Sequence, residues 1–192
     1  EGTEGQEFRR MYFSEHNAKK CDAVRMTIET WLVDGEINEN EYFFLLASLI
    51  NSIDKYANTA SVYGAYLKKL KKSAQKEMRL SPMPITKGNG NYRVFNRDIS
   101  QLIREVDGDI LYLDPPYNER QYCTNYHLLE TIARYDDPVI KGKTGLREYS
   151  EQKSLFCVKN KVAEVFEDLI KNAKFRYIFL SYNNEGLMPF DT

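Results

Sequence analysis

The spacing of apolar and polar positions divides the chain into a helical first part and an alternating second part. Apolar residues recur at helical spacing over residues 14–34 and 38–53, which predicts a helix over each range, and residues 65–78, which hold a lysine cluster, are read as a third helical segment. A serine begins the first range as a capping residue, and a glycine follows it as a stop. Residues 1–80 are therefore expected to form a helical region.

After a linker rich in proline and glycine at residues 81–90, the pattern changes. Short apolar runs predict strands at residues 92–95, 110–113 and 177–180, and helical spacing predicts helices at residues 101–106, 126–134 and 153–172. Because the strands alternate with helical crossovers, we expect a parallel sheet with helices on its faces. The run at residues 110–113 is typical of a strand buried on both faces. Residues 81–192 are thus predicted to be an α/β region.

The most informative string is Asp114-Pro115-Pro116-Tyr117, which directly follows the apolar run at residues 110–113. Proline cannot continue the hydrogen bonds of a sheet, so the strand must end at this point. The turn that follows presents a carboxylate, carbonyl oxygens and a flat aromatic ring. These groups can hold a planar base by its amino group and stack against its ring. The string therefore indicates a site that modifies a nucleotide.

Polar strings follow each of the predicted strands. They begin at Asp98, at Asp114 and at residues 181–186. Ligands of open parallel sheets bind just beyond the carboxyl ends of the strands. We therefore expect the polar strings to converge on one cleft.

The composition is that of a globular protein without an overall charge that attracts nucleic acid. Of the 192 residues, 42% are hydrophobic and 13% aromatic, and the formal net charge is −1. This charge disfavours a purely basic binding module but allows an enzyme with a local basic patch. Cys21, Cys123 and Cys157 lack paired-ligand spacing, so we expect reduced thiols and no metal site. No apolar stretch has the length of a membrane span, so we expect a cytoplasmic protein without membrane contact.

The string at residues 114–117 and its flanks resemble the catalytic segment of bacterial adenine-specific DNA methyltransferases. Those enzymes use S-adenosylmethionine and belong mostly to restriction–modification systems. The flanking residues that carry the resemblance are 58–64, 118, 120–122, 125–127, 129–131, 143–147 and 180–183. The resemblance covers residues 12–186 and implies a partial Rossmann-like methyltransferase sheet, mostly parallel. It implies a helical insertion at residues 1–80 that helps to recognise DNA, and a catalytic portion at residues 81–192.

The resemblance also implies how an adenine is held. The carboxylate of Asp114 and the main-chain carbonyl of Pro115 accept the two hydrogens of the 6-amino group. Pro116 fixes the placement of that carbonyl, and Tyr117 stacks on a base that has left the duplex. Direct transfer from the sulfonium of the cofactor requires orientation and electrostatics, without a covalent enzyme intermediate.

For the cofactor, the resemblance implies that Asp98 accepts from the adenine amino group of S-adenosylmethionine and that Ile99 packs on that ring. A helix N-cap is the alternative role for Asp98. Tyr182 is a candidate for the cofactor pocket, with strand-end packing as its alternative. The glycine-rich cofactor turn of the family is missing, and both ends of the chain look cut. We therefore expect a fragment that lacks the N-terminal cofactor motif.

Candidate DNA contacts are basic or aromatic and lie in separate parts of the sequence: Arg120, Tyr122, Lys68, Lys69, Lys143 and Arg147. The first pair follows the catalytic turn, and ordinary loop surface is its alternative. The lysines belong to a cluster between residues 68 and 76, for which a solvated helix face is the alternative. The last pair lies in a loop that is expected near the site.

The resulting hypothesis is a site-specific methyltransferase that moves a methyl group from S-adenosylmethionine to the 6-amino group of adenine in double-stranded DNA. A cognate restriction endonuclease is a candidate partner. Similar signatures methylate the amino groups of cytosine, RNA adenine and glutamine amides, so these acceptors are alternatives. A different class of alternative is an inactive fragment or a DNA-binding remnant.

Overall fold

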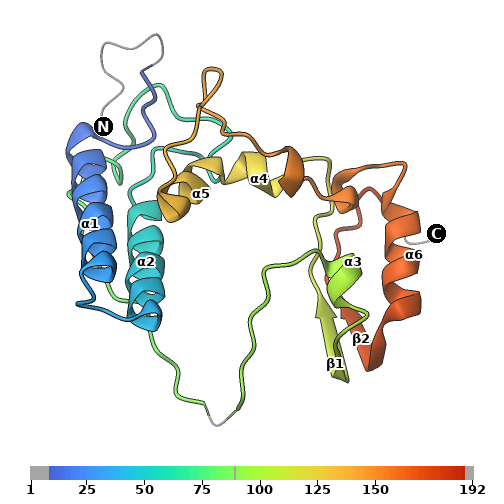
Figure 1. Ribbon diagram of the computed structural model, residues 1–192. Helices are drawn as coiled ribbons and strands as arrows, with labels where there is room; N and C mark the ends of the chain where they lie inside the picture. The colour runs from blue at the N-terminus through green and yellow to red at the C-terminus, as the bar shows by residue number, and fades with distance from the viewer. Residues whose placement is uncertain (1–8, 89, 189–192) are drawn as a thin grey trace. The chain divides into compact units, whose positions relative to one another are not determined.

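The computed structural model describes residues 9–88 and 90–188, and the chain divides into two compact units (Figure 1). The first unit joins residues 1–87 to residues 124–148, and the second joins residues 88–123 to residues 149–192. The sequence assigned residues 124–148 to the catalytic portion. They belong to the helical unit because helix α5 (His127–Arg134) packs its apolar side chains against the core of that unit.

The helical unit is built on α1 (Glu15–Val33) and α2 (Glu39–Asp54), which confirms both predicted helices. Ser14 caps α1 by accepting from the main-chain N–H of Asn17, and a reciprocal capping box begins α2. A glycine with a φ of 72° lies just after α1, in a conformation that other residues rarely adopt. The core between the helices consists of Cys21, Ile28, Leu49, Ile53 and Met78.

The buried guanidinium of Arg25 ties α1 to its neighbours. It donates to the carboxylate of Glu29 at 2.7 Å and to the hydroxyl of Tyr42 on α2 at 2.8 Å. It also donates to the main-chain carbonyl of Ile132 at 2.9 Å, in the last turn of α5. This satisfies a carbonyl that the helix itself leaves unpaired. The ion pair and hydrogen bond from Arg25 hold the pKa of Glu29 below its usual value.

The third predicted helix, over residues 65–78, is wrong. Side-chain amides bind the main-chain groups that a helix would have paired. Asn58 Nδ2 donates to the carbonyl of Leu67 at 3.0 Å, and Asn58 Oδ1 accepts from the N–H of Lys71 at 3.0 Å. Asn17 Oδ1 accepts from the N–H of Met78 at 2.8 Å. The segment therefore follows an irregular path that the side chains of two buried asparagines, Asn17 and Asn58, hold in place.

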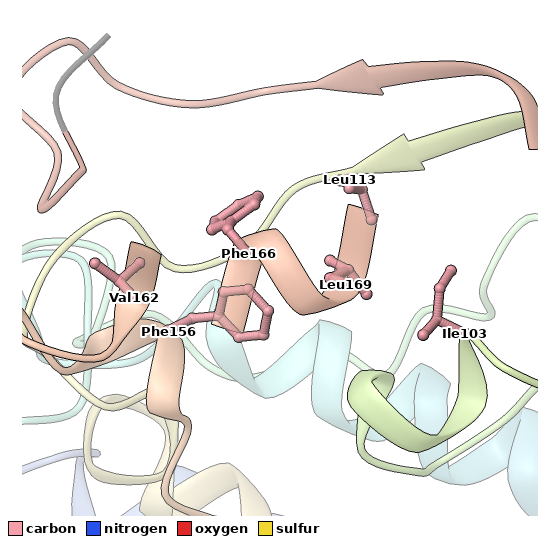
Figure 2. Packing of buried hydrophobic residues seen from close by; sticks show 6 residues of the cluster. All are labelled: Ile103, Leu113, Phe156, Val162, Phe166 and Leu169. Carbon is pink, nitrogen blue, oxygen red and sulfur yellow. The ribbon is translucent and has the colours of Figure 1, made fainter. Parts of the chain in front are cut away.

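The second unit contains a parallel pair of strands, β1 (Asp107–Leu113) and β2 (Lys174–Leu180), which confirms the parallel arrangement predicted for these strands. Leu113 is in register with Leu180. One face of the pair packs on α6 (Val162–Asn172) and on the short helix α3 (Ile99–Leu102). Figure 2 shows this core, which contains Ile103, Leu113, Phe156, Val162, Phe166 and Leu169.

The expectation of a strand buried on both faces is wrong for the described part of the chain. Ile110 and Tyr112 on β1 are 62% and 64% exposed, and Phe179 on β2 is 56% exposed. These side chains lie on the face opposite α6 because successive side chains of a strand alternate between faces. Only the face that carries Leu113 is covered by described residues.

Three other predicted elements of this unit differ from the structure. The strand at residues 92–95 is absent from the described chain, where these residues are exposed. The helix predicted at residues 101–106 begins and ends earlier, as α3. The helix predicted at residues 153–172 is reduced to α6, preceded by the 3₁₀ turns η1 (Ser150–Gln152) and η2 (Leu155–Cys157). Its first half is not helical because the side chain of Gln121 binds both main-chain groups of Ser154.

Three general findings complete the fold. All three cysteines are free thiols, and burial raises the pKa of Cys21 to about 12. No helix of the described ranges is both long enough and apolar enough to cross a membrane. Within the same ranges, no group of His, Cys, Asp and Glu side chains is arranged to hold a metal ion.

We expect Arg25→Ala to lower the free energy of unfolding by about 2–4 kcal/mol, because it removes the cationic partner of Glu29 and the side-chain donor to the end of α5. Urea unfolding followed by circular dichroism measures this change. The control is Lys19→Ala on the same helix. It breaks an exposed ion pair with Glu15 and should change stability by less than about 1 kcal/mol. Equal effects of the two substitutions would contradict the role of Arg25.

Candidate active site

The turn at Asp114 is held in place by main-chain hydrogen bonds on both sides. Before it, the carbonyl of Leu113 accepts from the N–H of Ser181 at 2.8 Å. After it, the carbonyl of Tyr117 accepts from the N–H of Leu187 at 2.9 Å. The polar string after β2 therefore lies along the turn after β1, as the parallel pairing requires.

Between these two hydrogen bonds lie acceptors that nothing in the described chain uses. The side chain of Asp114 is exposed, and within residues 9–88 and 90–188 no donor approaches its carboxylate or the carbonyl of Pro115. The nitrogens of Pro115 and Pro116 carry no hydrogen, so the turn offers acceptors without competing donors. Such a pair of oxygens is suited to an external amino group.

A cavity of about 840 Å³ opens beside this turn, a size that suits a cofactor or nucleotide. Its walls come from residues 96–100, 112–116, 151–156 and 164–169. The strings that begin at Asp98 and Asp114 therefore border one cavity, as the sequence predicted. The string at residues 181–186 supports the turn through Ser181 but is not part of the cavity wall.

Asp98 is the N-cap of α3, which is the alternative role predicted for it. Its Oδ1 accepts from the N–H of Ser100 at 2.8 Å and from the hydroxyl of the same residue. Its other oxygen, Oδ2, has no partner within the described residues. Both Asp98 and Ile99 border the cavity, so capping leaves one carboxylate oxygen available to a ligand.

The two candidate aromatic residues differ in their surroundings. Tyr117 is 41% exposed and lies directly after the proline pair. Tyr182 packs edge-on against Phe166, with ring centroids 5.9 Å apart, and its hydroxyl accepts from the N–H of Met188 at 3.4 Å. It does not border the cavity, so the packing alternative describes its place in this structure.

Most of the candidate DNA contacts are exposed. Arg120 and Tyr122 follow the catalytic turn with exposed side chains. Lys143 is exposed near the tip of a short hairpin, which the main-chain groups of Lys141 and Leu146 close with hydrogen bonds of 2.8 and 2.9 Å. The same hairpin brings Gly142 and Gly145 into left-handed conformations with φ of 69° and 74°. Lys68 and Lys69 are exposed on the irregular segment between the two asparagines.

Arg147 does not fit the phosphate contact predicted for it. Its side chain is 6% exposed, and its guanidinium binds both carboxylate oxygens of Asp136. The ion pair holds the pKa of the Asp136 carboxyl below its usual range. Arg147 therefore fixes the loop between α5 and the hairpin.

Gln121 is a residue whose role the sequence did not reveal. Its Oε1 accepts from the N–H of Ser154 at 2.8 Å, and its Nε2 donates to the carbonyl of Ser154 at 3.0 Å. Cys157 reinforces this contact through a hydrogen bond from its thiol to the carbonyl of Arg120. The segment after the catalytic turn is thus fixed to one wall of the cavity. The available signal was its place in the flank at residues 120–122, seven residues after Asp114.

A buried polar group of residues lies in the helical unit at His127. His127 Nε2 is 3.0 Å from the carbonyl of Tyr63 and 3.3 Å from the hydroxyl of Tyr12. The Tyr12 hydroxyl lies 2.7 Å from the same carbonyl and 3.1 Å from the carbonyl of Thr144. Burial lowers the pKa of His127 and raises that of Tyr12 to about 12. The histidine therefore joins three segments of the unit, and its burial disfavours the charged form.

The fold and site define a class: an α/β protein with a cavity at the carboxyl end of a parallel strand and, beside it, carboxylate and carbonyl oxygens that have no donor within the described residues. Residues 3–190 match the family described as D12 class N6 adenine-specific DNA methyltransferase. The chain belongs to this family.

Individual relatives agree with this assignment. The chain is 59% identical to type II methyltransferase M.NlaIII of Neisseria lactamica over 93% of its length, which is 53% of that relative. It is 50% identical to type II methyltransferase M.FokI of Planomicrobium okeanokoites, again over 93% of the chain and 28% of the relative. The chain thus spans about half the length of the first of these relatives and less than a third of the second. No solved structure matches it significantly.

We expect the lowered pKa of the buried His127 to make stability depend on pH. Because its pKa is lowered in the folded state, the unfolded state binds more protons below pH 6.5, and stability falls as the solution is acidified. Urea unfolding at about pH 7.5 and pH 5.5 measures the loss. His127→Gln removes the titrating group and should lose less stability between the two pH values. A loss of the same size in that variant would contradict the assignment.

Proposed function

We propose that the chain is the catalytic part of a site-specific DNA methyltransferase that methylates the 6-amino group of a flipped-out adenine. The observation that carries the proposal is the pair of unused oxygens on Asp114 and Pro115 at the edge of the cavity. Membership of the D12 family supports adenine in DNA over cytosine, RNA adenine or a glutamine amide. The relatives are longer than this chain, so the proposed activity and substrate are those of a whole protein of which the chain is one part.

The two oxygens act on the geometry of the amino nitrogen. The lone pair of that nitrogen is delocalised into the adenine ring, so it is a poor nucleophile in the planar state. Hydrogen bonds from the amino group to the Asp114 carboxylate and the Pro115 carbonyl favour the tetrahedral geometry that attack requires. Pro116 limits movement of the carbonyl because its ring restricts the residue before it.

Tyr117 is the residue proposed to hold the extruded base. Stacking of a base on an aromatic ring contributes about 1–3 kcal/mol, which offsets part of the cost of leaving the duplex. Its 41% exposure leaves ring surface available for such a contact. The main-chain hydrogen bond between Leu187 and Tyr117 fixes the backbone from which this ring projects.

For the cofactor, we infer that Asp98 and Ile99 bind the adenine ring of S-adenosylmethionine. The support is that both residues border the same cavity as Asp114, and that Asp98 Oδ2 is not used in capping. The cofactor supplies the electrophilic methyl group. In this arrangement the chain's own residues bind the adenine ring of the cofactor and orient the 6-amino nitrogen that accepts the methyl group. The transfer is then direct and needs no covalent enzyme intermediate.

The proposed substrate is double-stranded DNA. Arg120 and Tyr122, next to the catalytic turn, are proposed to contact the strand around the extruded base. Lys68, Lys69 and Lys143 are proposed to contact phosphates from the helical unit. That unit would be an insertion into a Rossmann-like, mostly parallel sheet of which β1 and β2 are members. Because the relatives named above are type II methyltransferases, a cognate restriction endonuclease is the proposed biological partner.

Asp114→Ala is expected to reduce methyl transfer to DNA by about 100- to 1000-fold, the loss that follows removal of one oxygen or donor aligned with a reacting group. Because Asp114 is exposed and unpaired within the described chain, stability should change by less than about 0.5 kcal/mol. Transfer of radioactive methyl groups to duplex DNA, followed by hydrolysis, measures the rate and identifies the methylated base.

The matched control for this experiment is Asp109→Ala, which removes an exposed acid within β1, away from the turn, and should leave the rate unchanged. Methylation by the Asp114 variant at the normal rate would refute the site. If the methylated base recovered is not N6-methyladenine, the site would stand but adenine would be the wrong methyl acceptor.

Substitutions of Asp98 separate its two roles. Asparagine caps helices about as well as aspartate, so Asp98→Asn should retain stability, whereas Asp98→Ala should lose about 1 kcal/mol. If Oδ2 binds the cofactor, the asparagine variant places an amide in that position and should bind S-adenosylmethionine about 10-fold more weakly. Calorimetry measures the affinity. If the asparagine variant binds S-adenosylmethionine as tightly as the unsubstituted chain, Asp98 only caps α3.

A further inference from the structure

We propose that Asn58 is a positioning residue that holds a phosphate-binding surface in shape before DNA arrives. The surface is the lysine segment, residues 67–79, which follows α2 along the chain (Figure 1). The inference rests on the proposed function, because it takes duplex DNA as the ligand. It adds that a buried amide determines how the exposed lysines are presented.

Asn58 is fully buried and its side chain is used completely. Nδ2 donates to the carbonyl of Met11 at 2.8 Å and to the carbonyl of Leu67 at 3.0 Å. Oδ1 accepts from the N–H of Lys71 at 3.0 Å. Its own main-chain groups add hydrogen bonds of 2.7 Å to Tyr12 and 2.9 Å from Leu67. One residue thus binds the lysine segment at two points and ties it to the start of the chain.

A second buried asparagine holds the other end of the segment. Asn17 Nδ2 donates to the carbonyl of Lys76 at 2.9 Å, and Asn17 Oδ1 accepts from the N–H of Met78 at 2.8 Å. In the middle, the ammonium of Lys71 donates to the carbonyl of Thr59 at 2.8 Å. The segment is therefore fixed at several points although it is not helical.

The charge of the segment is concentrated and largely uncompensated. It contains six cations and one anion, Glu77, so its formal charge is +5, whereas the whole chain has −1. Glu77 pairs with Lys20 at 2.7 Å, outside the segment. Four exposed lysines have no ion pair within the described residues: Lys68, Lys69, Lys72 and Lys76. Such a group of fixed like charges attracts a regular polyanion.

The fixed backbone of the lysine segment should strengthen its binding to DNA. Ligand binding by a flexible segment loses conformational entropy, and a segment already held in its bound shape avoids most of that loss. Main-chain rigidity at Leu67 and Lys71 also fixes where the intervening Lys68 and Lys69 begin. Loss of the Asn58 amide should thus weaken DNA binding without removing any charge.

A double-mutant cycle in the full chain tests this coupling. Binding to a duplex of mixed sequence is measured by fluorescence anisotropy at salt concentrations between about 50 and 200 mM. Removal of both charges in Lys68→Ala/Lys69→Ala should reduce the slope of log affinity against log salt by about 1.8, that is 0.9 for each phosphate contact. We expect Asn58→Ala to weaken binding about 10-fold, and the lysine substitutions to lose more than half of their effect in the Asn58→Ala background.

A control separates positioning from stability. Leu49→Ala on α2 removes a buried side chain of the same unit, and the lysine substitutions should retain their full effect in that background. Equal effects of the lysine substitutions with and without Asn58 would overturn the inference. An unchanged slope in the lysine variant would also overturn it, and the methyl-transfer assay on Asp114 would still decide the proposed reaction separately.

Hydrogen exchange in the unsubstituted chain provides a test that needs no variant. The amides of Leu67 and Lys71 should be protected in the free protein, because both bind Asn58, and DNA should change their protection by less than about twofold. Protection that develops only after DNA is added would overturn the inference.

Discussion

The site depends on the inability of proline to pair within a sheet. β1 must end at Leu113 because Pro115 and Pro116 have no N–H to donate, and this places Asp114 beyond the last strand hydrogen bond. The same property leaves acceptors without neighbouring donors. The cavity, the support from the segment after β2 and the position of Tyr117 all follow from where the strand ends.

Side-chain amides hold the irregular segments of both units. Asn17 and Asn58 hold the lysine segment, and Gln121 fixes the segment after the catalytic turn to the wall of the cavity. In each case an amide supplies both a donor and an acceptor to main-chain groups that regular structure does not pair. Irregular backbone can thus be as well defined as a helix, and both proposed binding surfaces, for the cofactor and for DNA, are built in this way.

The sequence predicted the elements that depend on local signals. The cap at Ser14 and the apolar spacing located α1 and α2 to within a residue or two, and the apolar runs located β1 and β2. The end of β1 before the proline pair was also predicted, because proline cannot continue a sheet, and the catalytic role of this turn stays a prediction. The wrong predictions concern the helices over residues 65–78 and 153–172, where distant amides compete for the backbone. The burial of Arg147 was not predicted for a different reason: its ion-pair partner, Asp136, becomes a neighbour only after folding.

The central claim is that the Asp114 carboxylate and the Pro115 carbonyl hold one amino group. A crystal structure of the whole protein with duplex DNA and a cofactor analogue that cannot transfer its methyl group tests it most directly. The account predicts an extruded adenine whose 6-amino nitrogen lies about 2.7–3.2 Å from both oxygens, with its ring against Tyr117. An adenine held by other residues, or one that stays stacked in the duplex beside a fully bound protein, would contradict it.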